Sequence, residues 1–125
     1  MVRNTILPLK GFDAITVYPF VFVRKDRLLS DRLIRHEAIH GEQQKELTMT
    51  GAALAAALWY FIGWWSLLFA PLFFWWYCVE WLVRLLIYRN ADKAYSSICF
   101  EKEAYGNQDD ADYLKTRKLF AFIRG

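Results

Sequence analysis

Cysteine is scarce in this chain of 125 residues, which contains only Cys78 and Cys99. Two cysteines exclude a disulfide framework and favour a compartment that is reducing or in which the redox state does not matter. Concentrated positive charge is also missing, because the 16 basic residues are interleaved with 13 acidic ones, and we therefore expect no nucleic-acid partner. The segment 1–10 lacks an apolar run of signal-peptide length, so entry into a membrane would use an internal segment.

One long stretch of the chain has no charge. No Asp, Glu, Lys or Arg occurs between Glu46 and Glu80, and all six tryptophans fall within 59–81. The chain is nevertheless 23% charged, close to the ~25% of ordinary globular proteins, so the charges are concentrated in its two ends. We therefore predict a single membrane-associated domain over 1–125, made of a polar part over 1–46, an apolar part over 47–88 and a polar part over 89–125.

The apolar part is long enough for two membrane crossings. A helix needs about 20 residues to cross ~30 Å of hydrocarbon, and 47–88 contains two such lengths. Gly63 and Pro71 can break a helix, and a turn between them predicts a helical hairpin of two transmembrane helices. Because nearly all Lys and Arg lie outside this part, we expect a protein of the cell (inner) membrane with both ends in the cytoplasm. The alternative is a hairpin buried inside a soluble helical domain.

The two polar parts contain the remaining predicted elements. Residues 14–18 and 20–24 are rich in β-branched and aromatic side chains and are separated by Pro19, which predicts two short strands or one bent strand. Ser30 can cap a helix and Asp31 suits its first turn. Helices are predicted over 31–48, 91–107 and 109–124. The expected fold class is mainly α, with a short β hairpin or strand near the N-terminus.

The motif His36-Glu37-Ala38-Ile39-His40 lies on the first of these predicted helices. Histidines at positions i and i+4 are one helical turn apart, so both imidazoles can reach one zinc ion. Glu37 lies one residue round the helix, where its carboxylate can accept a proton from water that the metal activates. The motif therefore predicts His36 and His40 as metal ligands and Glu37 as general base. The alternative is two surface histidines beside an unrelated glutamate.

A catalytic zinc site usually has three protein ligands, so a third is needed. Glu46 lies six residues after His40, where metzincin peptidases place their third histidine, but that pattern needs glycine at the position of Gln43, and we discount it. Glu101 and Glu103 lie on the predicted helix over 91–107. They are two residues apart and point in different directions, so only one of them can face the metal.

The HEAIH motif followed much later by FEKEAY resembles the gluzincin class of zinc metallopeptidases, whose third ligand is a glutamate on a later helix. A glutamate three residues before an alanine is similar to the arrangement in membrane gluzincins of the CAAX-protease, heat-shock-protease and antibiotic-sensor type. The resemblance implies a Zn²⁺ cofactor with Glu101 as third ligand, three residues before Ala104, and Glu103 as the fallback. It departs at Tyr105, where those families often have aspartate that supports a histidine.

The leading functional prediction is a small integral-membrane zinc metallopeptidase that hydrolyses a peptide or protein substrate. Tyr95 and Tyr105 could donate to a developing oxyanion, and the strand over 20–24 could offer an edge to an extended substrate. The metal ligands can meet only if an even number of crossings puts them on one side of the bilayer. The alternative is a non-catalytic membrane protein, either a metal-stabilised scaffold or an interaction partner. Nothing in the sequence indicates an oligomeric state.

Overall fold

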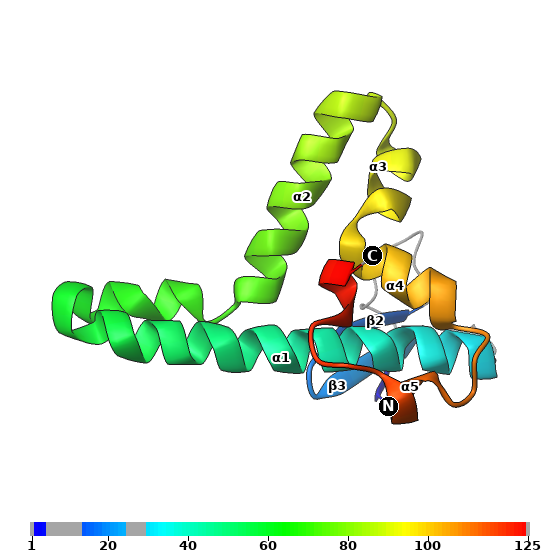
Figure 1. The fold of residues 1–125 in the computed structure, drawn as a ribbon, viewed down its shortest axis with the longest axis horizontal. Helices are drawn as coiled ribbons and strands as arrows, with labels where there is room; N and C mark the ends of the chain where they lie inside the picture. Colours follow the sequence, from blue (N-terminus) through cyan, green and yellow to red (C-terminus); the bar gives the residue numbers. More distant parts are fainter. Residues whose placement is uncertain (1, 5–13, 25–29, 125) are drawn as a thin grey trace.

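The computed structural model describes residues 2–4, 14–24 and 30–124, which are mainly helical with a small sheet near the N-terminus, as predicted (Figure 1). Most of the segment 1–10, considered above for a signal peptide, lies outside the described residues. The strands are β1 (Val2–Asn4), β2 (Ala14–Val17) and β3 (Phe20–Arg24). The helical elements are α1 (Asp31–Ile62), η1 (Gly63–Phe69), α2 (Leu72–Tyr88), α3 (Ala91–Ser97), α4 (Cys99–Asn107), α5 (Tyr113–Thr116) and η2 (Ala121–Arg124).

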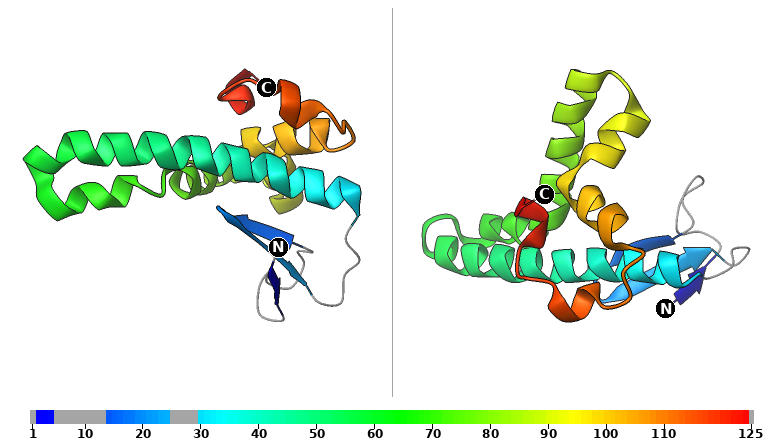
Figure 2. Two further views of the ribbon diagram at one scale, coloured as in Figure 1. Left: turned by 90° about the horizontal axis from the view of Figure 1, so that it is seen from below. Right: turned by 45° about the vertical axis from the view of Figure 1, so that its right-hand side comes forward.

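The predicted hairpin is formed by β2 and β3, which pair antiparallel with Val17 opposite Phe20. β1 pairs in parallel with the other side of β3, so the strand order is β1-β3-β2. The sheet lies on one side of α1, while α4 and the C-terminal segment lie on the other (Figure 2, left). The expectation that 20–24 offers an edge to a substrate is wrong, because β3 is the central strand.

Helix α1 begins where the sequence predicts and continues further than predicted. The Ser30 hydroxyl accepts a hydrogen bond from the backbone N–H of Leu33 at 3.1 Å, which caps the first turn. The helix does not end near Thr48, because the following residues are alanine-rich and favour helix. It ends at Gly63, whose positive φ of 56° suits a residue without a side chain. α1 is therefore 32 residues, about 48 Å, long.

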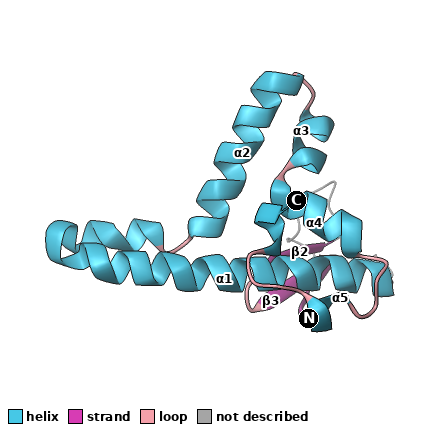
Figure 3. Ribbon diagram, in the orientation of Figure 1, coloured by secondary structure: helices cyan, strands magenta, loops and turns pink. Residues whose placement is uncertain are grey.

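The apolar part folds back at Gly63, within the predicted turn region, but it does not form two transmembrane helices. η1 returns along α1 so closely that a Cβ on Gly51 would lie 2.3 Å from the carbonyl oxygen of Phe69. Pro71 then separates η1 from α2, which leaves α1 at a steep angle (Figures 1 and 3). The prediction of two spans is wrong because this break leaves α2 with 17 residues. In the described part of the chain, one helical stretch, Asp31–Phe69, is long and apolar enough to cross a membrane.

The C-terminal helices are shorter than predicted because tertiary contacts interrupt them. The predicted helix over 91–107 is broken at the buried Ile98, where the Glu80 carboxylate accepts the backbone N–H of Cys99 at 3.0 Å and so caps α4. The predicted helix over 109–124 is reduced to α5 and η2, because Arg117 between them turns inward to buried carboxylates. The core between α1, α2, α4 and η2 contains Leu47, Phe73, Ile98, Phe100 and Phe122.

Candidate metal centre

Helices α1 and α4 bring together the three side chains that the sequence offered as metal ligands. The Nε2 atoms of His36 and His40 are 3.1 Å apart. Oε2 of Glu101 lies 3.3 Å from Nε2 of His36 and 3.4 Å from Nε2 of His40. All three side chains are buried, with exposed fractions of 9%, 9% and 3%. His36 and His40 are adjacent because they are one helical turn apart, and Glu101 faces them because α4 packs across α1.

The separations between these three atoms have the size that a zinc ion requires. Zinc bonds to histidine nitrogen and carboxylate oxygen are about 2.0–2.2 Å long, and a tetrahedral angle then places two ligand atoms ~3.4 Å apart. The three separations in the structure, 3.1, 3.3 and 3.4 Å, agree with this value. A His-His-Glu set is also a donor set that catalytic zinc sites use. The residues present therefore fit a zinc ion with its fourth position open.

Electrostatics also favour a cation at this point. Oε1 of Glu101 accepts a hydrogen bond from the hydroxyl of Tyr77 at 2.9 Å, whereas Oε2 is buried without a hydrogen-bond partner among the described residues. Although burial raises it, the pKa of Glu101 is held well below its usual range by His36 and His40. The group is therefore an anion beside two imidazoles, and such a cluster attracts either a metal ion or a proton.

Two glutamines orient the histidine rings, and neither was predicted as part of the site. Nδ1 of His40 lies 2.8 Å from Oε1 of Gln43, and Nδ1 of His36 lies 3.0 Å from Oε1 of Gln108. In the opposite orientation of the Gln108 amide, its nitrogen would donate to His36 and its oxygen would accept from Arg32. In the sequence Gln43 stands out only as a departure from the glycine of the metzincin pattern. Gln108 carries no sequence signal, because it approaches His36 from a distant segment.

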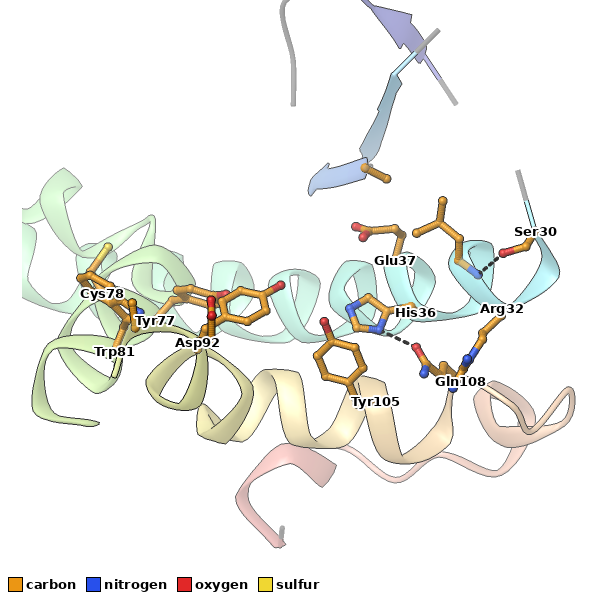
Figure 4. Close-up of a pocket in the computed structure, with 14 residues that line it drawn as sticks. Ser30, Arg32, His36, Glu37, Tyr77, Cys78, Trp81, Asp92, Tyr105 and Gln108 are labelled. Atoms are coloured by element: carbon orange, nitrogen blue, oxygen red, sulfur yellow. Dashed lines mark hydrogen bonds between the residues drawn. The ribbon is translucent and has the colours of Figure 1, made fainter. Parts of the chain in front are cut away.

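Glu37 lies beside the three-residue cluster and is held by the sheet. The Thr16 hydroxyl lies 2.6 Å from Oε2 of Glu37 and 3.0 Å from its backbone carbonyl oxygen. Gln44 fixes the strand by donating to the carbonyl oxygen of Thr16 and accepting from the backbone N–H of Tyr18, both at 2.7 Å. Glu37 is outside the ligand cluster and lines a cavity of about 910 Å³ (Figure 4). Its position suits proton transfer from a group bound in that cavity.

The other carboxylates considered as ligands lie elsewhere. Glu103, the fallback ligand, forms an ion pair with Arg117 and accepts a hydrogen bond from the hydroxyl of Tyr113 at 2.8 Å. Glu46 pairs with the same Arg117. The structure therefore separates the two glutamates of α4, with Glu101 toward the histidines and Glu103 toward the C-terminal segment, as their spacing of two residues requires.

Tyr95 and Tyr105 both line the cavity next to His36. The ring of Tyr105 contacts that of His36, with the two centroids 4.6 Å apart (Figure 4). Burial, and then the Glu101 carboxylate, raise the pKa of both tyrosines above the usual range. Their hydroxyl groups therefore keep their protons at neutral pH and can act as hydrogen-bond donors.

Comparison with protein-family models, with curated proteins and with solved structures finds no match to this chain.

Proposed function

We propose that this chain is a small membrane-embedded metallopeptidase that holds one zinc ion with His36, His40 and Glu101. The observation that carries the proposal is the triangle of ligand atoms, whose sides of 3.1–3.4 Å suit one tetrahedral ion. The unpartnered Oε2 of Glu101 supports it, because a buried carboxylate oxygen without a donor is costly unless a cation satisfies it. The proposal agrees with the resemblance of the two motifs to gluzincins.

The zinc ion would supply Lewis acidity, which lowers the pKa of water and polarises the carbonyl group to be cleaved. Glu37 would accept the proton from that water and pass it to the leaving amine. Thr16 would hold the Glu37 carboxylate in place through its 2.6 Å hydrogen bond. Tyr105 or Tyr95 would donate to the oxygen on which negative charge develops. A peptide or protein is the substrate class that this set of roles serves.

The exposed aromatic surface supports the membrane part of the proposal. Tyr60, Trp64 and Trp65 are 89%, 75% and 73% exposed at the far end of α1 and in η1. Within the stretch Asp31–Phe69, only 11% of the most apolar 18-residue segment is buried against the rest of the chain. Lipid would cover this surface, and the reversal at Gly63 would return the chain to the side from which it entered. Under the positive-inside rule, the metal centre and both ends of the chain would then lie in the cytoplasm.

Metal content tests the site directly. The full chain in detergent should bind one zinc ion per molecule, and the double variant His36→Ala, His40→Ala should bind none. Elemental analysis after dialysis measures both, with Glu42→Gln as the matched control because Glu42 is part-exposed on the same helix and pairs with Lys45. A wild-type protein without zinc, or zinc retained equally by the double variant, would exclude the centre.

Catalysis needs a separate test. Glu37→Gln should keep its zinc and lose hydrolysis of a library of quenched fluorescent peptides, because the amide cannot accept the proton. Equal hydrolysis by both forms would remove Glu37 as the base. Zinc binding without hydrolysis by the wild type would instead favour the alternative of a metal-stabilised scaffold.

A further inference from the structure

Gln43 is fully buried between α1 and α4, three residues after His40 on the same helix. Each polar atom of its amide group has a partner. Oε1 lies 2.8 Å from Nδ1 of His40. Nε2 donates to the carbonyl oxygen of Phe100 at 3.0 Å and to Oε2 of Glu103 at 2.7 Å. The side chain thus links a histidine of the metal centre to the helix that carries Glu101.

The partners of the amide determine which way it faces. Phe100 and Glu103 present oxygens that only accept, so the amide nitrogen has to face them and the amide oxygen has to face His40. An amide oxygen cannot donate, and Nδ1 of His40 must therefore carry the hydrogen. In that tautomer the lone pair of the ring is on Nε2, which is the atom that faces His36 and Glu101.

Glu103 is itself kept as an acceptor by a second layer of donors. Its Oε1 accepts from Tyr113 and from Nε of Arg117, and its Oε2 lies 3.3 Å from Nη2 of Arg117. Arg117 is anchored in turn by Glu46 on α1. A network of donors and acceptors therefore runs from Arg117 through Glu103 and Gln43 to His40, and the side chains of all four residues are buried.

We propose that Gln43 is the positioning residue that holds His40 in the tautomer able to bind metal through Nε2. The inference rests on the proposed zinc centre and adds to it the residue that orients one of its ligands. Glu103, which the sequence offered as a ligand, has the role of fixing Gln43.

Zinc affinity measured by competition with a chelator tests this role. Gln43→Met keeps the volume of the side chain but cannot accept from Nδ1, and it should weaken zinc binding by ~10- to 100-fold, the usual effect of removing such a partner. The control Glu42→Gln should bind zinc like the wild type. Equal affinity of Gln43→Met and wild type would overturn the role of Gln43 and leave the zinc centre standing. A wild type that binds no zinc would exclude both.

Two further measurements apply if Gln43→Met does not fold. Nitrogen-15 NMR of histidine in the zinc-loaded wild type should show the proton of His40 on Nδ1 and the metal on Nε2, and the reverse pattern would overturn the proposal. Gln43→Glu should bind zinc weakly, because it sets a carboxylate against that of Glu103. The double variant Gln43→Glu, Glu103→Gln restores a donor facing an acceptor and should recover part of the affinity. No recovery would contradict the donor and acceptor assignment.

Discussion

Replacing Arg117 by methionine should destabilise the chain strongly and in a pH-dependent way. Arg117, Glu46 and Glu103 have side chains only 3–4% exposed, and the substitution leaves both carboxylates without their cation. Removing one partner of a buried ion pair costs about 3–5 kcal/mol. A proton can take the place of the missing cation, so this cost should be larger at neutral pH than in acid, where protons are more readily taken up.

The assay is unfolding of the detergent-solubilised chain at pH 7 and pH 5. The loss of unfolding free energy for Arg117→Met should be about 3–5 kcal/mol at pH 7 and should be clearly smaller at pH 5, because a proton can then more easily replace the missing cation. Lys115→Met, which removes an exposed ion pair with Asp112, serves as the control and should change little. A loss that is the same at both pH values, or below about 1 kcal/mol at pH 7, would refute the reasoning that buried charge is the cause.

Two further outcomes follow from the contacts around the centre. Thr16→Val removes the hydroxyl that holds Glu37 and should lower the rate of peptide hydrolysis by about tenfold, with the zinc content unchanged. Loss of zinc from this variant would show instead that Thr16 supports the metal ligands. In the presence of a chelator, the free energy of unfolding should be highest between about pH 4.5 and 6.5. Burial lowers the pKa of His40, but Glu101 outweighs burial and raises the pKa to about 9. The stabilisation that protonated His40 gains from Glu101 is therefore complete below about pH 6.5 and is lost as the pH rises toward 9. Glu101 has a lowered pKa, so its contribution is lost as the pH falls below about 4.5. A flat pH profile of the unfolding midpoint would contradict both assignments.

The elements that the sequence predicts well depend on local chemistry. The cap at Ser30, the strands on both sides of Pro19 and the reversal at Gly63 each arise from one or two residues. The one-turn spacing of His36 and His40 likewise follows from helix geometry alone. Such features can be predicted because no distant residue is needed to form them.

The features that the sequence did not predict depend on distant partners. The break at Ile98 exists because Glu80, on another helix, accepts the N–H of Cys99. The segment 109–124 does not form one helix because Arg117, in its middle, turns inward to pair with Glu46 and Glu103. The roles of Gln43 and Gln108 are similar cases, since amide side chains acquire a function only from the groups that surround them.

The return of η1 along α1 determines where α2 begins. Because the chain folds back, α2 starts beside the middle of α1 rather than at its far end. The first turns of α2 therefore pack against α4. The ring centroids of Phe73 and Phe100 are 4.5 Å apart, and the hydroxyl of Tyr77 donates to Glu101 at 2.9 Å. A shift of α2 would therefore move Tyr77 and, through its hydrogen bond, the carboxylate of Glu101. The apolar part of the chain thus forms one wall of the cluster of His36, His40 and Glu101.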